Sequence, residues 1–309
     1  MPALARDSIA QFHKRLHRWY GQHGRKDLPW RNTDDAYAIY ISEIMLQQTQ
    51  VKTVLERYYT PFLKRFPTLS HLAKSDADDV LQAWQGLGYY NRAMNLRAAA
   101  QACKTALPKT VEELLALPGI GRNTAHAVSA FAYRQPVAVM EANVKRVISR
   151  VFALTHPKEP ELWEKAAMLL DTDNPFDYNQ AMMDIGAMVC TKRAPACNIC
   201  PANNICMGQT SPESFPAPKA KKLTPVREKH IAVLRNRQGH YHAVPRSGRF
   251  LNGLYHFMEM DKTESVISYG KQKIPLTNGQ ALGHVRQQYS HFTLEADVWL
   301  LEVDDSQSN

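Results

Sequence analysis

The turn Pro118-Gly119-Ile120-Gly121 constrains the fold of this chain more than any other stretch. Proline and glycine interrupt a helix, yet the segments on both sides, Val111–Ala116 and about Arg122–Tyr133, have helical spacing. The two glycines let another group come close to the backbone, and they leave N–H groups pointing outward at a helix N-terminus. We therefore expect both glycines and Arg122 to bind a phosphate. A tight interhelical turn without a ligand is the alternative interpretation.

The overall charge of the chain agrees with a phosphate-bearing partner. With 309 residues it is long enough for two or three domains, and its formal net charge is +9. A positive charge of this size favours a polyanion such as nucleic acid, although a basic protein without such a partner is also possible. We find no apolar run that could span a bilayer and no secretory signal, so we expect a cytoplasmic protein without a membrane partner.

The pattern of apolar residues predicts a mainly α fold. Beyond an amphipathic N-terminal helix, helical spacing covers Ala36–Tyr59, Asp76–Trp84, Arg92–Lys104, Val111–Ala116, Arg122–Tyr133, Val144–Leu154, Glu161–Leu170 and Asn179–Val189. From Met207 onward, several prolines and Lys219, Lys221 and Lys222 indicate a linker. Short strands are expected after it at His230–Leu234, Tyr241–Val244, Tyr255–Met260 and Thr293–Leu301, with turns at Gln238-Gly239 and Asn278-Gly279. A helical body thus precedes a smaller β-rich domain, and a polar frayed end begins at Asp304.

Four of the five cysteines form a compact group with the spacing C-x6-C-x2-C-x5-C: Cys190, Cys197, Cys200 and Cys206. Disulfides are not expected in a chain without an export signal, so the group predicts a metal loop. Four-cysteine sites hold either zinc or an iron–sulfur cluster, and the single close pair favours a cluster while leaving zinc open. The fifth, Cys103, is expected to be a small core residue.

Two carboxylates are candidates for chemistry. Glu43 lies in a stretch that is apolar almost all round, and burial would raise its pKa and let it act as a general acid. A structural Glu paired with an arginine or a helix N-terminus is the alternative. Glu141 is a lone carboxylate in the loop 135–143. The polar run Gln47–Gln50, directly after the apolar stretch, is typical of a helix end that meets a ligand.

Together these stretches resemble the helix-hairpin-helix DNA glycosylases, and within them the MutY-type adenine DNA glycosylases. The resemblance covers roughly residues 10–300 and rests on SEIMLQQTQV (42–51), GLGYYNRAMNL (86–96), LPGIGRNTA (117–125), NVKRV (143–147), NQAMMDIGAMVC (179–190) and the four-cysteine loop. It implies a six-helix domain over 30–137 and a cluster domain over 1–29 and 138–209, in which the four cysteines hold a [4Fe-4S] cluster. It also implies a linker over 210–226 and a small α+β Nudix-like domain over 227–309.

The resemblance also implies an activity. Such an enzyme binds double-stranded DNA as a monomer and flips out adenine paired with 8-oxoguanine or guanine. Glu43 would protonate the base, and Glu141, beside Asn143, would stabilise the oxocarbenium-like sugar or trap it. In a bacterial cell the enzyme would work at the nucleoid.

The residues that would contact DNA follow from the same resemblance. The adenine pocket would include Trp30, Arg31, Asn123 and Asp184. Gln48, Thr49, Leu87 and Tyr89 match residues at the opened base pair, of which Gln48 and Tyr89 would enter the base stack. Tyr289, Ser290 and His291 match the loop that reads 8-oxoguanine, the alternative being an ordinary strand start. The clustered glutamates of Nudix hydrolases are missing, so we expect no pyrophosphatase activity.

Three positions depart from the family pattern. Asn123 stands where endonuclease III-type enzymes have a Schiff-base lysine, which implies base removal without strand cleavage. Glu141 stands where the family has aspartate, and His126 replaces a small residue. A glycosylase for thymine or oxidised pyrimidines, and a lesion-binding protein with weak catalysis, are the alternative functions.

Overall fold

The computed structural model describes residues 5–103, 105–218, 223–246 and 254–304. The chain divides into two compact units, Met1–Lys219 and Ala220–Asn309. Lys104 at the end of an expected helix, Lys219, Lys221 and Lys222 of the expected linker, and the tail after Asp304 lie outside the described residues.

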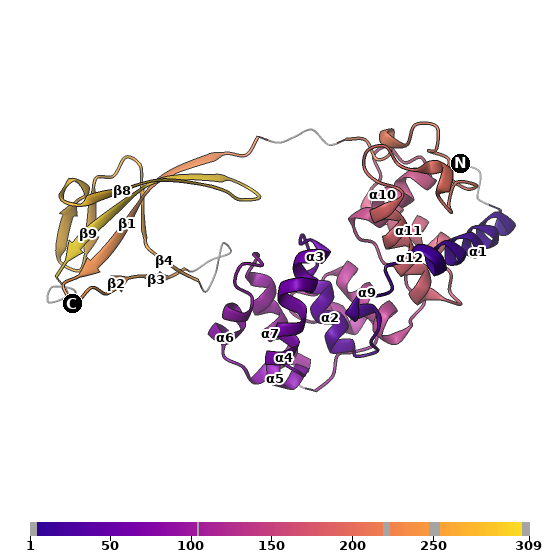
Figure 1. Cartoon of the computed structure of the whole chain (residues 1–309), viewed down its shortest axis with the longest axis horizontal. Coiled ribbons are helices and arrows are strands. Elements are labelled where there is room, and N and C mark those ends of the chain that lie inside the picture. The colour runs from indigo at the N-terminus through magenta and orange to yellow at the C-terminus, as the bar shows by residue number, and fades with distance from the viewer. Residues whose placement is uncertain (1–4, 104, 219–222, 247–253, 305–309) are drawn as a thin grey trace. The chain divides into compact units, whose positions relative to one another are not determined.

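The first unit is helical (Figure 1). Its α-helices are α1 (Arg6–His23), α2 (Ala36–Met45), α3 (Val51–Thr53), α4 (Tyr59–Arg65), α5 (Leu69–Lys74), α6 (Ala77–Ala83), α7 (Asn91–Cys103), α8 (Val111–Leu115), α9 (Arg122–Tyr133), α10 (Ala142–Val151), α11 (Glu159–Leu169) and α12 (Pro175–Met188). The 3-10 helices η1 (Pro29–Arg31), η3 (Cys197–Ile199) and η4 (Pro212–Ser214) and the π-helix η2 (Val54–Tyr58) complete it. The expected helical body is therefore confirmed.

One expected helix is wrong. The apolar stretch from Ala36 does not continue to Tyr59, because α2 ends at Met45 and the backbone turns at Gln48, whose φ is 55°. A left-handed φ cannot continue a right-handed helix. The polar run after the apolar stretch thus marks a helix end, as expected. The helix that follows contains the π-turn η2, since Pro61 has no N–H for the α-helical bond to residue 57.

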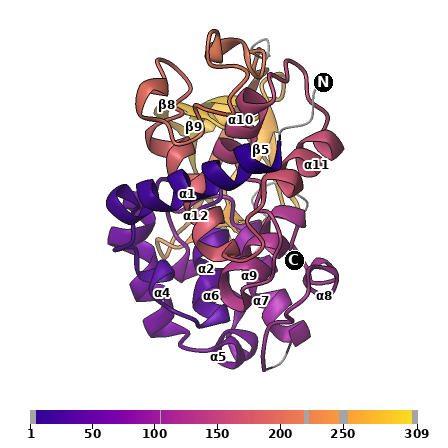
Figure 2. The same cartoon turned by 90° about the vertical axis from the view of Figure 1, so that its right-hand side faces the viewer.

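Two hydrophobic cores support the first unit. One is built around α2, α4 and α7, with Trp84 and Tyr40 among its fully buried side chains. The other joins α1, α10, α11 and α12, and Figure 2 shows α1 lying against α12. Helix α9 packs against both α2 and α12. A third group of buried side chains joins these elements: Ile39, Ala127, Ala130, Phe131 and Val139.

The second unit consists of strands and the 3-10 helix η5 (Leu276–Asn278) in the residues that the structure describes. Its strands are β1 (Val226–Asn236), β2 (Tyr241–His242), β3 (Val244–Pro245), β4 (Tyr255–His256), β5 (Met258–Asp261), β6 (Val266–Tyr269), β7 (Gln272–Pro275), β8 (Gln280–Gln288) and β9 (Thr293–Val303). The main sheet has the order β2-β1-β9-β8, in which β1 and β9 are parallel, and β5 also pairs with β1. Two hairpins, β3-β4 and β6-β7, stand beside it.

All four expected strands lie in this unit, and the expected turn at Gln238-Gly239 joins β1 to β2. Strands β6, β7 and β8 escaped prediction. Every residue of β8 is exposed, so its sequence lacks the apolar alternation that a half-buried strand shows. The small core comes instead from β1, β5, β6 and β9.

None of the helices in the described residues combines the length and apolar character that crossing a bilayer requires.

Candidate active site

Glu43 lies in the last turn of α2, whose other residues from Tyr37 to Met45 are buried. Burial of the carboxyl raises the pKa of Glu43 to about 7; the positive charge of Arg31 opposes this rise and the negative charge of Glu141 adds to it. A carboxyl with this pKa holds its proton in an appreciable fraction of molecules at neutral pH. The structure therefore provides the environment that the sequence predicted for a general acid.

Glu141 approaches from a different element. It is the N-cap of α10, in extended conformation, and its Oε1 accepts a hydrogen bond of 3.2 Å from the backbone N–H of Val144. The helix N-terminus favours a negative charge there. The fold brings the two predicted carboxylates near enough for the negative charge of Glu141 to raise the pKa of Glu43. Asn143 lies two residues after Glu141, and its Oδ1 accepts a hydrogen bond from Nη2 of Arg146 at 2.9 Å.

The loop that carries Glu141 is fastened by polar side chains. Asn123 Oδ1 accepts a hydrogen bond from the N–H of Met140 at 2.9 Å, and a ring nitrogen of His126 contacts the carbonyl of Ala138 at the same distance. Asn179 of α12 binds both the N–H of Val139 and the carbonyl of Val137. The sequence analysis missed Asn179, although an asparagine in an apolar helix is a usable signal.

Arg31 and Asp184 form a buried ion pair. Nη1 and Nη2 of Arg31 donate to the two carboxylate oxygens of Asp184 at 2.8 and 2.9 Å, and Arg25 adds hydrogen bonds from its backbone N–H and its Nε. Burial would raise the pKa of Asp184, but the hydrogen bonds and positive charges of Arg31 and Arg25 hold it below its usual range. With 0% exposure, Asp184 serves to fix Arg31, while Trp30 packs edge-on against Tyr59.

The glycine turn has the conformation that its sequence predicts. Gly119 has a φ of 71°, and a Cβ there would lie 2.4 Å from Cβ of Asn95, so no other residue fits. Gly121 is the N-cap of α9, with open space around it. The guanidinium of Arg122 lies 4.1 Å from the ring centre of Trp163. The backbone of the turn is thus open to a ligand, whereas the Arg122 charge rests on an indole.

Two exposed turns carry the residues matched to the opened base pair. Gln48 and Tyr89 both have left-handed backbone, with φ of 55° and 51°, and both side chains are exposed. Thr49 is bonded to its own turn through the carbonyl of Gln47. Leu87, in contrast, is buried in the core of the first unit.

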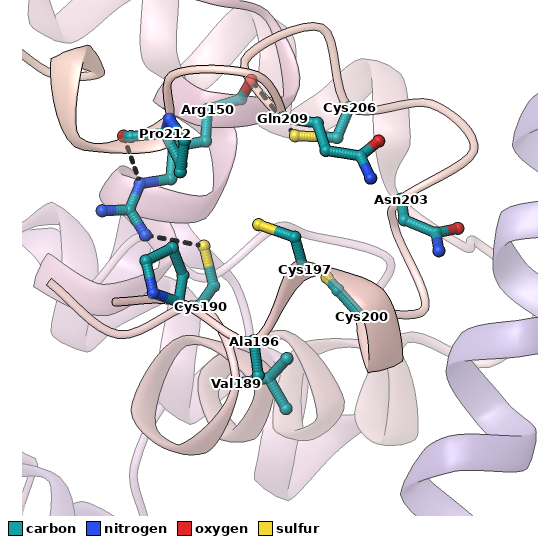
Figure 3. A pocket seen from close by; sticks show the side chains of 11 residues that line it. Arg150, Val189, Cys190, Ala196, Cys197, Cys200, Asn203, Cys206, Gln209 and Pro212 are labelled. Atoms are coloured by element: carbon teal, nitrogen blue, oxygen red, sulfur yellow. Dashed lines mark hydrogen bonds between the residues drawn. The ribbon is translucent and has the colours of Figure 1, made fainter. Parts of the chain in front are cut away.

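The four clustered cysteines line one pocket, as Figure 3 shows, together with Arg150 and Pro212. The buried Arg150 donates from Nη1 to Sγ of Cys190 at 3.3 Å, and Sγ of Cys206 lies 3.5 Å from the carbonyl of Arg150. Arg146 reaches from Asn143 to the carbonyl of Cys190. Cys103 lies apart, in α7 against the first core, as expected.

The donor set of this pocket fits a thiolate-bound metal group. Burial raises the pKa of Cys200 to about 12 and that of Cys206 to about 11, so these thiols need a cationic partner to ionise. Among the described residues, no three His, Cys, Asp or Glu side chains converge on a point where one metal ion would be held. Four thiols that line one pocket are a donor set that suits either zinc or an iron–sulfur cluster.

Tyr289, Ser290 and His291 form the turn between β8 and β9. The N–H of Tyr289 donates to the carbonyl of Phe292 at 2.9 Å, and the rings of Tyr289 and His291 contact the buried Phe292. Ser290 and His291 are exposed. The segment is thus a tight hairpin tip anchored by one aromatic residue.

Known proteins resemble this chain. Residues 41–170 match the family described as HhH-GPD superfamily base excision DNA repair protein. An adenine DNA glycosylase of Buchnera aphidicola subsp. Acyrthosiphon pisum is 32% identical over 297 residues, which cover 92% of this chain and 85% of that protein. The adenine DNA glycosylase of Rattus norvegicus is 42% identical over 216 residues, 64% of this chain and 42% of the relative.

Solved structures agree in fold. The structure of a thermostable thymine-DNA glycosylase has a TM-score of 0.61 and 28% identity, covering 66% of this chain and 97% of its own. A non-covalent complex of endonuclease III with DNA gives a TM-score of 0.57 at 18% identity, covering 67% and 98%. Both likenesses span about the length of the helical unit.

Proposed function

The chain belongs to the adenine DNA glycosylases of the HhH-GPD superfamily, enzymes that remove adenine in base excision repair, and we propose that it acts on adenine paired with 8-oxoguanine or guanine. The observation that carries the proposal is the coupled pair of carboxylates, Glu43 with a pKa of about 7 and Glu141 at a helix N-terminus. Glu43 can donate a proton, and Glu141 lies where a helix N-terminus favours a negative charge.

The reaction follows from these two roles. The flipped adenine leaves with the electron pair of its glycosidic bond, and protonation by Glu43 makes it a neutral leaving group. The sugar then becomes cationic, and the Glu141 carboxylate stabilises it or traps it covalently. Water completes the hydrolysis at the sugar carbon and returns a proton to the site.

The reaction that we propose is monofunctional. The amide of Asn123 has no nucleophilic amine and cannot form a Schiff base with the sugar, so the products are free adenine and an intact abasic strand. The hydrogen bond of Asn123 to the N–H of Met140 supports a different task, which is to hold the loop that carries Glu141.

The contacts to DNA are also part of the proposal. Arg31, fixed by Asp184, and Trp30 would line the adenine pocket, and Asn123 would border it. The glycine turn and Arg122 would bind a phosphate. Gln48, Thr49, Leu87 and Tyr89 would surround the opened pair, and the exposed tip at Tyr289, Ser290 and His291 would read 8-oxoguanine. We also propose a monomer that works in the bacterial cytoplasm, at the nucleoid.

We propose that Cys190, Cys197, Cys200 and Cys206 hold a [4Fe-4S] cluster. Four thiols that line one pocket, within a stretch of seventeen residues, support this assignment. When bound, the cluster would supply iron–thiolate bonds that cross-link the segment 190–206. The buried Arg150 would remain as a positive charge beside Cys190.

The cluster assignment predicts a brown protein with about four iron atoms per chain. Cys197→Ser should lose most of the iron and the visible absorption, because one ligand is removed. Cys103→Ser is the matched control and should keep both, since Cys103 lies outside the pocket. Iron and zinc analysis with a visible spectrum measures this. A colourless, zinc-loaded wild type would contradict the assignment.

The substrate assignment predicts release of free adenine under single-turnover conditions. We expect adenine from duplexes with A opposite 8-oxoguanine or G, and no thymine from a T opposite G. Borohydride should trap little covalent complex, because no lysine intermediate forms. Release of thymine, or strong trapping, would contradict the proposal. Tight duplex binding without adenine release would favour the lesion-binding alternative that Glu141 raises.

A further inference from the structure

Arg92, in the first turn of α7, makes an unusual set of hydrogen bonds. Its Nη1 donates to the carbonyls of Ile44, Met45 and Gln47, at 2.7, 3.2 and 2.6 Å. The first two carbonyls belong to the end of α2, where helical carbonyls carry partial negative charge. One guanidinium nitrogen therefore holds the end of the helix that carries Glu43 and the turn that follows it.

The other side of the same guanidinium holds a second turn. Nη2 donates to the carbonyls of Leu87 and Gly88 at 3.4 and 3.1 Å. The guanidinium carbon lies 5.4 Å from the ring centres of both Trp84 and Tyr89. Burial lowers the pKa of Arg92 to about 10, which leaves it charged at neutral pH. A single cation thus bridges the segments 44–48 and 86–90.

Both segments have backbone conformations that need outside support. Gln48 and Tyr89 are left-handed although neither is glycine, and such residues persist where the surroundings hold them. Each lies within two residues of a carbonyl that Arg92 binds. Both side chains point into solvent, where a duplex could meet them.

We propose that Arg92 is a positioning residue that joins these two turns into one rigid support, so that Gln48 and Tyr89 enter the DNA together when adenine is extruded. The inference rests on the proposed function and assigns to Arg92 the opening of the base pair rather than the bond cleavage. Among the described residues, Arg92 donates to backbone carbonyls and to neither carboxylate, so it acts through the two turns.

Lysine cannot replace arginine in this role. Its ammonium is a single point with three donors, whereas the planar guanidinium donates in two directions at once. Lysine would keep the charge at the end of α2 and release one of the two turns. Arg92→Lys therefore tests the link between the two turns while keeping the positive charge.

The test measures base extrusion directly. Duplexes carry A opposite 8-oxoguanine with 2-aminopurine beside the adenine, and its fluorescence rises when the adenine leaves the stack. All proteins carry Glu43→Gln, which prevents excision during the measurement. Arg92→Lys should reduce the extrahelical signal about 10- to 100-fold, the scale that displacement of about 1 Å produces. An unchanged signal would overturn the proposal.

Arg97→Lys is the matched control. Arg97 lies on the same helix and donates to the carbonyl of Ser75, away from both turns, so its replacement should leave the signal unchanged. An equal loss in both variants would indicate damage to α7 alone and overturn the proposal. A second comparison uses proteins that already carry Tyr89→Ala. In them, Arg92→Lys should lower the signal little further, because both residues act on the extrusion of adenine.

Failure of the proposed function gives a different result. A wild type that releases no adenine from any duplex contradicts the function, whatever Arg92 does. A wild type that releases adenine, with normal extrusion in Arg92→Lys, contradicts this inference alone.

Discussion

Glu43→Gln is expected to lower the single-turnover rate of adenine release by about 1,000-fold, within the range of general acid catalysis. Glutamine has nearly the same shape as glutamic acid but cannot give a proton to the leaving base. The end of α2 should stay intact, since Arg92 holds it through the carbonyls of Ile44 and Met45. Rates on a duplex with A opposite 8-oxoguanine, together with the dissociation constant for the same duplex, measure the effect. Affinity should change little.

The pH dependence of the wild type provides the control. The pKa of Glu43 is raised to about 7, so the acid form dominates below this pH and is lost above it. The rate should therefore fall as pH rises through about 7, and Glu43→Gln should lack this fall. A rate that is flat from pH 6 to 8, or a fast Glu43→Gln, would remove Glu43 from the role of acid.

Glu141→Gln has the second largest expected effect, a loss of about 100-fold or more, which is the scale of electrostatic stabilisation by one group. The amide oxygen can still accept the hydrogen bond from the N–H of Val144, so the cap of α10 is kept while the charge is lost. The negative charge of Glu141 raises the pKa of Glu43. Its removal should also move the fall in rate to lower pH.

Glu141→Asp distinguishes the effect of the negative charge from the effect of side-chain length. Aspartate keeps the charge and is a good N-cap, but it withdraws the carboxylate by one methylene. We expect its rate to lie between those of the wild type and Glu141→Gln. A Glu141→Gln enzyme as fast as the wild type would show that this carboxylate takes no part in catalysis.

Much of the helical body could be predicted because its signals are local. The glycine turn and α9 are encoded by a few neighbouring residues, and Arg122–Tyr133 was found with its observed bounds. The polar run Gln47–Gln50 indicated a helix end, but the helical spacing continued to Tyr59. The turn at Gln48 depends on contacts such as the one from Arg92 of a distant helix to the carbonyl of Gln47. Strand β8 has no apolar face, so the pattern of apolar residues could not predict it.

In the candidate site, too, some residues could be predicted from the sequence and others could not. The sequence pointed to Glu43, Glu141 and the four cysteines, because an isolated carboxylate or a thiol spacing is visible in one dimension. It could not reveal that Asp184 is saturated by Arg25 and Arg31, since that pairing joins residues about 150 positions apart. Asn179 and Arg92 were missed for the same reason.

The two carboxylates stand on helices from different cores, α2 from one and α10 from the other. Each half of the helical unit carries one of the two carboxylates, and Ile39 and Val139 help to join the halves. Under the proposed function, catalysis therefore depends on the interface between the two halves of the helical unit. A substitution deep in either core, far from DNA and from both carboxylates, could misalign the pair while leaving each half well folded.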